Sequence, residues 1–502
     1  MDKQVKIKSP QAYEQAQVRL TRRSLLKKMG LAAGTIVTLP ACSSIQQAGS
    51  SPKNRPNIVV IVADDLGYAD TGCQGCKDIA TPNIDSIARN GVHFTDGHVS
   101  CPVCSPTRAG LITGRYQQRF GHEFNPGAPP EGAKENIGLP LTEITMADIL
   151  KRAGYTTAVV GKWHLGMAPR FNPTKRGFDE FFGFLHGAHS YIDPGLGSAN
   201  PIMRGTESVD EKEYLTDAIT REALGFIERH EHKPFFLYLT YNAVHQPMQA
   251  PDRYKNSFKH IANPTRQIYA GMLTAMDEGI GKVLGKLREL GVEKDTLIFF
   301  LSDNGGPTQN GSNNGPLRAT KGTMYEGGIR VPLMVQWRTK LKGGRTYDQP
   351  VIALDILPTA AAAAGAELPK DRKIDGVNLL PYITGDLKTP PHDILFWRAG
   401  QNYAARRGNY KLVTMGTETG LYDLSADIGE TNNLRAEKPD IVQELQREFQ
   451  RWSSQMVEPL WGGRQRKPAT TTTKTKKPGV RRRQKPTVEV KSGPAVGPPQ
   501  IP

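Results

Sequence analysis

Four oxygen-bearing side chains closely follow two runs of apolar, mostly β-branched or aromatic residues, 57–63 and 296–301. They are Asp64, Asp65, Asp303 and Asn304. Such runs predict strands buried on both faces, and open α/β sheets bind ligands at the carboxyl ends of their strands. Neighbouring carboxylates repel each other unless a cation lies between them, and a set of oxygen ligands selects Ca²⁺ or Mg²⁺ over Zn²⁺. We therefore predict a divalent-cation site at this edge of the sheet.

A second candidate for chemistry is the twelve-residue segment 104–115. It reads Cys104-Ser105-Pro106-Thr107-Arg108 at its start and Thr113-Gly114-Arg115 at its end. This order resembles Cys-x-Pro-x-Arg followed four residues later by Thr-Gly, which is the signature of the type I, formylglycine-dependent sulfatases of the alkaline-phosphatase-like superfamily. An early proline and small residues also fit a helix that begins near Pro106 and directs the positive end of its dipole at a nucleophile.

Other segments agree with the resemblance in the order in which they occur. They are 81–85 (TPNID), 162–166 (KWHLG), His245 within 242–247, Lys321 within 319–322, 421–424 (LYDL) and 429–434 (GETNNL). The resemblance covers residues 55–460. It implies an alkaline-phosphatase-like three-layer domain with a large mixed, mostly parallel sheet, a smaller C-terminal subdomain, and sulfuric ester hydrolase activity.

The resemblance also implies a role for each matched residue. Cys104 becomes formylglycine (3-oxoalanine), whose hydrate attacks sulfur with one hydroxyl and uses the other to release sulfate. One Ca²⁺ per chain is held by residue 104 together with Asp64, Asp65, Asp303 and Asn304. Arg108 steadies the hydrate, Lys162 and Lys321 bind sulfate oxygens, His164 is the base, and His245 is the acid for the leaving oxygen. The implied partner is the formylglycine-generating maturation enzyme.

Several alternatives stay open from the residues themselves. The same fold could cleave phosphomonoesters or phosphonate esters, or the chain could be an unmatured binding protein. The pairs Cys73/Cys76 and Cys101/Cys104 also resemble a four-cysteine zinc site, although the 24 residues between them are more than usual. If Cys104 is converted, the other three cysteines remain as buried thiols, or one pair oxidises after export.

The expected substrates are sulfated polysaccharides or their oligosaccharides. Two polar loops with aromatic and histidine residues, 119–123 and 186–191, suit recognition of a sugar ring, and ordinary loop packing is an equal alternative for both. The sequence leaves open the identity of the sugar, the position of the sulfate, and whether the enzyme acts within a polysaccharide or at its end.

Alternating patterns predict the elements that position these residues. Strand-like runs occupy 57–63, 156–160, 235–240, 296–301 and 331–337, and helical patterns occupy 84–90, 143–153, 214–230 and 266–290. This alternation predicts an α/β catalytic domain over residues 55–375, with a largely parallel sheet covered on both faces. Short strands at 403–407 and 410–414 and a helix at 439–452 predict a C-terminal subdomain over 376–462, with an antiparallel sheet and a helix.

The two ends of the chain carry its net charge of +16. Eight Lys/Arg and two acids lie in residues 1–42, and eleven Lys/Arg and one acid lie in 464–502, so the body between them is neutral. Because the charge lies outside the folded body, no nucleic-acid function is expected. Residues 463–502 are rich in Pro, Thr, Lys and Arg and predict a disordered basic tail.

The first 42 residues predict an export signal. They contain the pair Arg22-Arg23, an apolar stretch over 29–40 that is too short for a stable membrane anchor, and the sequence LPAC ending at Cys42. This pattern resembles a twin-arginine signal peptide with a bacterial lipobox. We expect lipidation of Cys42, a polar linker over 43–54, and a lipoprotein in the periplasm or at the outer membrane of a bacterium.

Overall fold

The computed structural model describes residues 55–127, 136–193 and 200–462. The predicted signal peptide with Cys42, the linker 43–54 and the predicted tail 463–502 lie outside the described residues, and their predictions stay untested. Within the described part of the chain, no helix is both long and apolar enough to cross a lipid bilayer.

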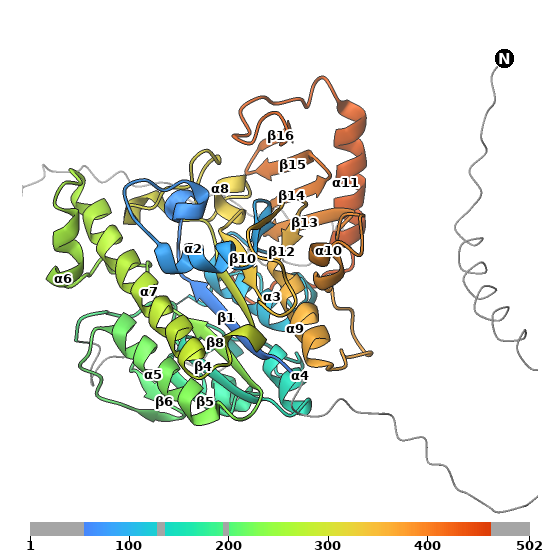
Figure 1. Cartoon of the computed structure of the whole chain (residues 1–502). Helices are drawn as coiled ribbons and strands as arrows, with labels where there is room; N and C mark the ends of the chain where they lie inside the picture. Colours follow the sequence, from blue (N-terminus) through green and yellow to red (C-terminus); the bar gives the residue numbers. More distant parts are fainter. Residues whose placement is uncertain (1–54, 128–135, 194–199, 463–502) are drawn as a thin grey trace, which may run out of the picture. The chain divides into compact units, whose positions relative to one another are not determined.

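A ten-stranded mixed sheet forms the centre of the protein (Figure 1). Its spatial order is β11-β2-β10-β9-β1-β8-β4-β5-β6-β7. The bounds are β1 (Asn57–Ala63), β2 (Val92–Phe94), β4 (Thr156–Lys162), β5 (Glu180–Phe184), β6 (Met203–Arg204), β7 (Glu207–Ser208), β8 (Phe235–Thr240), β9 (Thr296–Ser302), β10 (Leu333–Gln336) and β11 (Arg345–Tyr347). The neighbours from β9 through β1, β8 and β4 to β5 are all parallel, whereas β10 is antiparallel to β9. The sheet is therefore mixed and mostly parallel at its centre, as predicted.

Helices cover both faces of this sheet. One face carries α2 (Pro82–Arg89), α5 (Leu215–His230) and α7 (Pro264–Glu289), and the other carries α3 (Cys104–Thr113), α4 (Met146–Arg152) and α9 (Ile356–Ala364). Side chains alternate along a strand, so Val60 of β1 packs on the α3 side while its neighbours Val59 and Ile61 pack on the α7 side. This arrangement explains why β1 and β9 are continuous apolar runs, and it confirms the predicted three-layer α/β domain.

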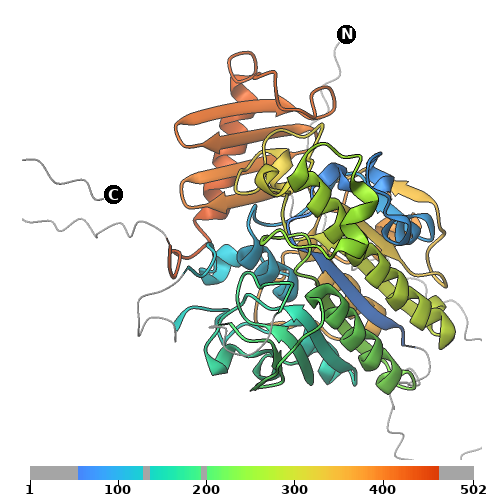
Figure 2. The same cartoon turned by 90° about the vertical axis from the view of Figure 1, so that its left-hand side faces the viewer.

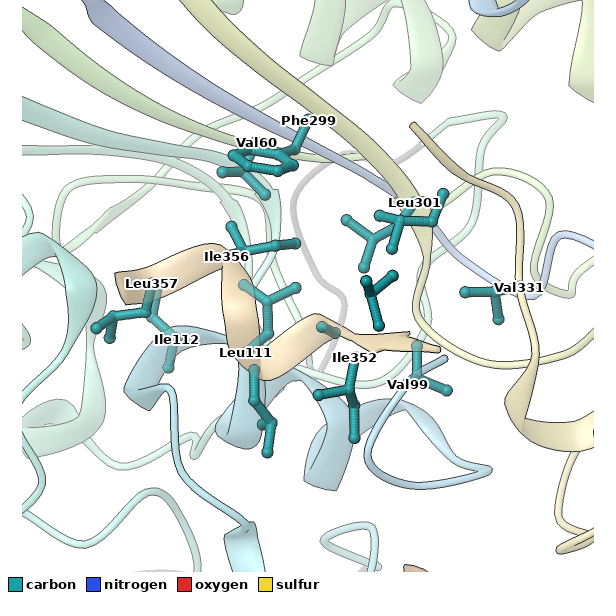
Figure 3. Packing of buried hydrophobic residues seen from close by; sticks show 14 of the residues in the cluster. Val60, Val99, Leu111, Ile112, Phe299, Leu301, Val331, Ile352, Ile356 and Leu357 are labelled. Carbon is teal, nitrogen blue, oxygen red and sulfur yellow. The ribbon is translucent and has the colours of Figure 1, made fainter. Parts of the chain in front are cut away.

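The helix that begins at Cys104 is held against the sheet by apolar packing. Figure 3 shows Val60 of β1 and Leu301 of β9 facing Leu111 of α3 and Ile356 of α9. All four side chains are fully or almost fully buried. Packing of this kind fixes the height of α3 relative to the strand ends, and so it fixes the position of its first residue.

A separate four-stranded antiparallel sheet follows the main domain in the chain. It consists of β13 (Ile394–Ala399), β14 (Asn402–Arg407), β15 (Tyr410–Met415) and β16 (Glu418–Asp423), and α11 (Pro439–Ser453) lies across β14 and β15 (Figure 2). Apolar residues of α11 recur at helical spacing and pack on the sheet, and the ring of Trp452 stacks on that of Phe396 with centroids 5.1 Å apart. The predicted antiparallel sheet and helix are confirmed.

The remaining α-helices and strands of the described residues are short. They are α6 (Asp252–Lys255), α8 (Glu326–Ile329), α10 (Leu380–Thr384) and the two-stranded parallel pair β3 (Gly97–His98) and β12 (Val351–Ile352). The helix expected to start near Pro106 begins two residues earlier, at Cys104, because Val103 is the last residue with an extended backbone. Arg108 therefore lies just over one turn into α3.

Candidate active site

The predicted site residues meet at one edge of the main sheet. The strands β9, β1, β8 and β4 are consecutive parallel neighbours, so their carboxyl ends lie side by side. Asp64 and Asp65 follow β1, Asp303 and Asn304 follow β9, and Lys162 is the last residue of β4. The backbone at Gly161 has φ 117°, and an added Cβ there would lie 1.8 Å from the carbonyl oxygen of Thr240. Only glycine allows β4 to approach β8 this closely, so it helps to fix Lys162.

Cys104 lies at the N-terminus of α3 and is 1% exposed. Its Sγ lies 3.3 Å from Nζ of Lys321 and 3.7 Å from Oδ1 of Asp64. Burial raises the pKa of the thiol to about 12, although Lys162 and Lys321 act in the opposite direction. An unmodified thiol at this position is therefore protonated at neutral pH.

Three cationic side chains pair with three carboxylates around Cys104. Nζ of Lys162 lies 2.5 Å from Asp64, Nζ of Lys321 lies 2.5 Å from Asp65, and Nε and Nη2 of Arg108 lie 2.9 Å and 2.7 Å from Oδ2 of Asp303. All of these side chains except that of Lys321 are at most 3% exposed. Charged groups are buried at this density only when they are paired or hold an ion. The cluster can therefore bind a cation through its acids and an anion through its bases.

The donor set fits a hard divalent cation. Oδ1 of Asn304 is buried and receives no hydrogen bond from any described residue, whereas its Nδ2 donates to Oδ1 of Asp65 at 2.7 Å. An orphaned buried carbonyl oxygen beside three carboxylates is the arrangement that Ca²⁺ or Mg²⁺ completes. Asp64, Asp65, Cys104 and His245 also each offer a ligand atom within 4.8 Å of the others. Three of the predicted ligands are in this group with His245, which was not predicted as a ligand, and Oδ1 of Asp303 lies 3.4 Å from the backbone nitrogen of Asp65.

His164 is held in a strained position directly after β4. Its φ is 58°, its N–H donates to the carbonyl oxygen of Leu185 at 3.2 Å, and its own carbonyl oxygen accepts from Oγ of Ser105 at 2.6 Å. The ring packs against Gly187, where an added Cβ would lie 2.7 Å from two ring atoms. Burial, and then the charge of Lys162, holds the pKa of His164 well below its usual value. The imidazole is therefore held in its neutral form, and its buried Nδ1 has no hydrogen-bond partner among the described residues.

His245 lies on the loop after β8 and is the more exposed of the two predicted catalytic histidines. Its Nε2 lies 3.6 Å from Oδ2 of Asp65, and its side chain is 20% exposed. Tyr191 is fully buried, and its hydroxyl lies 2.6 Å from the carbonyl oxygen of Asn242 and 2.8 Å from that of His245. Tyr191, from the candidate loop 186–191, therefore holds the loop that carries His245, as the alternative of ordinary loop packing would have it.

The charged residues of loop 119–123 form ion pairs within the fold, which favours the alternative of ordinary loop packing for them. Arg119 pairs with Asp375 through two contacts of 2.6 Å and 2.7 Å, and Glu123 pairs with Arg398 at 2.8 Å. These side chains are at most 13% exposed, because they join the loop to the region after residue 370. The spacing of these residues along the chain does not indicate such distant partners.

His122, from the same loop, lies behind the candidate nucleophile. It is fully buried, its Nε2 lies 2.6 Å from Oγ of Ser105, and its ring meets that of Trp461 edge-on at 4.6 Å. Burial lowers the pKa of His122 to about 3, so the ring is neutral. Its contact with Ser105 links it to the carbonyl oxygen of His164, so His122, a sequence candidate for substrate recognition, is packed behind residue 104. Ser105 had no role assigned from the sequence.

The four-cysteine zinc site is not formed. Among the described residues, only two groups offer three or more potential metal-ligating side chains close together, and neither unites the cysteines. Cys73, Cys76, Cys101 and Cys104 are all free thiols. The second group, Asp96 with His98 and Glu326, already has buried cationic partners. These are Arg330, Arg406 and Lys411.

Comparison with protein-family models identifies the family. The model described as Sulfatase matches residues 56–366, and the model described as N-sulphoglucosamine sulphohydrolase, C-terminal, matches residues 319–455. The N-acetylgalactosamine-6-sulfatase of Mus musculus is 35% identical over 410 residues, which cover 74% of this chain and 76% of that protein. The uncharacterized sulfatase YdeN of Escherichia coli (strain K12) is 32% identical, covering 80% of this chain and 86% of its own.

The comparison with solved structures agrees with the family models. The structure of Ps i-CgsB in complex with k-i-k-neocarrahexaose superposes with a TM-score of 0.77 at 38% identity, covering 81% of this chain and 94% of that one. A phosphonate monoester hydrolase of Agrobacterium radiobacter superposes with a TM-score of 0.61 at 20% identity, which shows a shared fold alone. These matches agree with the Cys104 signature at the start of α3 and with the acidic residues at the strand ends. The chain therefore belongs to the sulfatase family and is a sulfuric ester hydrolase of alkaline-phosphatase-like fold.

Proposed function

We propose that this sulfatase hydrolyses sulfate esters of polysaccharides or their oligosaccharides, with formylglycine formed from Cys104 as nucleophile and one Ca²⁺ as cation. The observation that carries the proposal is the position of Cys104. It begins α3 between Lys321 and Asp64, with Asp65, Asp303 and Asn304 around it. Formylglycine supplies an oxygen nucleophile where burial would keep a thiol protonated, and Ca²⁺ supplies positive charge next to it.

The remaining side chains suit an anionic ester. A sulfate ester resists attack because its oxygens are negatively charged, so positive groups that face those oxygens stabilise the transition state. Lys162 and Lys321 bind the oxygens, and Arg108 holds charge beside the nucleophile. His164, neutral and buried, takes up a proton at residue 104, and the more exposed His245 protonates the leaving oxygen. Asp64, Asp65, Asp303 and Asn304 hold the cation.

A carbohydrate substrate is supported by the solved structures to which this chain is similar. Ps i-CgsB, which is 38% identical, was solved with an oligosaccharide bound. Another solved structure with this fold, which is 27% identical, comes from work on the metabolism of multiple glycosaminoglycans. A further one with this fold is the PsFucS1 sulfatase. An exported lipoprotein anchored through Cys42 would meet such polymers outside the cytoplasm, and the neutral body gives no reason to expect nucleic-acid binding.

The first experiment is peptide mass spectrometry across residue 104, on protein made in a host with a formylglycine-generating enzyme. We expect sulfur to be lost from residue 104 and an aldehyde oxygen gained. Cys101 provides a matched control, because it is an equally buried thiol three residues away. Cys101→Ala should keep the modification, and Cys104→Ala should abolish activity. An intact thiol at residue 104 in active enzyme would contradict the proposed nucleophile.

Parallel assays then separate the substrate classes. An aryl sulfate and the matching aryl phosphate should differ strongly in kcat/KM, in favour of the sulfate. A panel of sulfated oligosaccharides should contain at least one substrate with a higher kcat/KM than the aryl sulfate, because remote binding energy contributes to catalysis. A preference for the phosphate ester would replace the proposal with a phosphoesterase.

A further inference from the structure

The turn after β16 contains the segment 429–434, which the site described above does not use. Glu430 in this turn is fully buried and has φ 50°. The carboxylate of Asp427 accepts hydrogen bonds from the N–H and Oγ1 of Thr431 at 2.8 Å and 2.9 Å and from the N–H of Asn432 at 2.7 Å. These bonds hold the turn rigid, and a rigid turn can keep Glu430 in a backbone conformation that is unfavourable for its side chain.

Glu430 contacts both ends of one loop in the main domain. Its carbonyl oxygen accepts from Nη1 of Arg318 at 2.6 Å, and its Oε2 accepts from the N–H of Glu326 at 2.7 Å. The N–H of Gly327 donates to the carbonyl oxygen of Arg318 at 2.8 Å and closes the base of the loop. One residue of the turn that follows the C-terminal sheet thus fixes the spacing and the orientation of the two ends of loop 318–327.

A buried lysine bridges the carboxylates of Glu430 and Glu326. Nζ of Lys411, on β15, lies 2.9 Å from Oε1 of Glu430 and 2.7 Å from Oε1 of Glu326. The side chains of these three residues are all 0% exposed. Because two unpaired carboxylates would repel each other here, Lys411 joins the loop and the turn into one unit.

The tip of the same loop carries Lys321. Its Nζ lies 2.5 Å from Oδ1 of Asp65 and 3.3 Å from Sγ of Cys104. The adjacent N–H of Gly322 donates to the carbonyl oxygen of Pro102 at 2.9 Å, so the tip is docked beside the start of α3. A lysine is a flexible point charge, and its aim depends on the backbone that carries it.

We propose that Glu430 is a positioning residue for Lys321: the C-terminal sheet holds loop 318–327 so that this lysine faces the reacting group. The inference rests on the proposed function in one respect, which is that Lys321 binds the sulfate of the substrate. It gives the C-terminal sheet a part in the chemistry of a site to which it contributes none of the predicted catalytic residues.

The test is a double-mutant cycle on the matured, full-length enzyme. Glu430→Ala and Lys321→Ala should each lower kcat/KM for an aryl sulfate, Glu430→Ala by about 10- to 100-fold if the lysine shifts by up to 1 Å. If Glu430 acts through Lys321, adding Glu430→Ala to Lys321→Ala should change kcat/KM no further. Glu430→Gln, whose amide oxygen can still accept from Glu326, should retain more activity than Glu430→Ala.

A control separates positioning from loss of stability. Leu445→Ala removes a buried side chain from α11, in the same subdomain, without touching the loop. It should lower Tm as Glu430→Ala does and leave kcat/KM near that of the parent enzyme. Amide hydrogen exchange should rise in peptides covering 318–327 in Glu430→Ala and stay unchanged in Leu445→Ala.

Three results would overturn the inference. They are additive effects in the cycle, equal activity losses in Glu430→Ala and Leu445→Ala, and unchanged exchange over 318–327. If Glu430→Ala does not fold, the cycle is run with Glu430→Gln, where additivity with Lys321→Ala has the same meaning. A parent enzyme that is matured but cleaves no sulfate ester would contradict the proposed function instead, and the exchange measurement would still decide whether Glu430 holds the loop.

Discussion

Replacing Gly187 with alanine is a steric probe of His164 that removes no chemical group. The new Cβ would lie 2.7 Å from Cε1 and from Nε2 of the His164 ring. Non-bonded carbon atoms are in contact at about 3.5–4.0 Å, so the ring must move by about 1 Å. His164 is 7% exposed and is fixed at φ 58° by backbone bonds on both sides, so little free space is available for this movement.

The size of the effect follows from this displacement. A misplacement of about 1 Å can cost about 100-fold in rate, which equals about 2.7 kcal/mol of transition-state stabilisation. Because the base acts after substrate binds, the loss should fall mainly on kcat. We therefore expect Gly187→Ala to lower kcat by about 10- to 100-fold and to change KM for an aryl sulfate little.

The assay compares Gly187→Ala with Gly285→Ala at equal, measured formylglycine content. Gly285 lies in α7 with only the end of Arg288 nearby, at 3.8 Å, so the same substitution there meets open space. Gly285→Ala should leave kcat unchanged and raise the free energy of unfolding by about 0.5–1 kcal/mol. If Gly187→Ala turns over at the parent rate, with its Tm unchanged, then the position of His164 does not limit the reaction and its assignment as base is wrong.

Three further predictions concern metal, stability and pH. Chelation should lower Tm, and Ca²⁺ should restore it, with a gain of about 2.7 kcal/mol at 100 times Kd; a Tm indifferent to both would contradict the cation site. Arg108→Lys keeps the charge but loses the two-pronged contact with Asp303, so the free energy of unfolding in urea should fall by about 1–3 kcal/mol. His392 Nε2 lies 2.9 Å and 3.0 Å from the Asp355 carboxylate, which outweighs burial and raises the His392 pKa above 6.5. Its stabilisation is full below pH 6.5 and lost as pH rises through the raised value, so the Tm deficit of His392→Gln should be larger at about pH 5.5 than at about pH 8.5.

The central strands could be predicted because burial on both faces leaves a continuous apolar run. The predicted strands 57–63 and 235–240 agree with β1 and β8 residue for residue. The run 331–337 is shortened to β10 (Leu333–Gln336), in part because Pro332 has no N–H to donate to the ladder. The helix predicted from residue 143 begins at Met146, where Thr145 and Asp148 form a capping box that the sequence T-x-x-D could have revealed.

The residues of the candidate site also divide into those that could be predicted from the sequence and those that could not. Groups at strand ends, such as Asp64 and Lys162, were predictable because a parallel sheet collects its carboxyl ends at one edge. Contacts between distant parts of the chain were not, because nothing in the spacing of residues pairs Glu430 with the loop of Lys321, or Arg119 with Asp375. The last two strands of the sheet, β6 and the edge strand β7, have two residues each and are also too short to leave a period in the sequence.

The charges of the site couple its cation to its anion. Three acids and three bases around Cys104 neutralise one another in pairs. A divalent cation held by the acids leaves two positive charges in excess, which an anionic sulfate group offsets. Inorganic sulfate should therefore bind more tightly with Ca²⁺ than without it, and by linkage sulfate should raise the affinity for Ca²⁺ by the same factor. Calorimetric titrations in both orders measure the two factors. Equal sulfate Kd values with and without Ca²⁺ would mean that the lysines are held by the acids in both states, and that they do not bind sulfate.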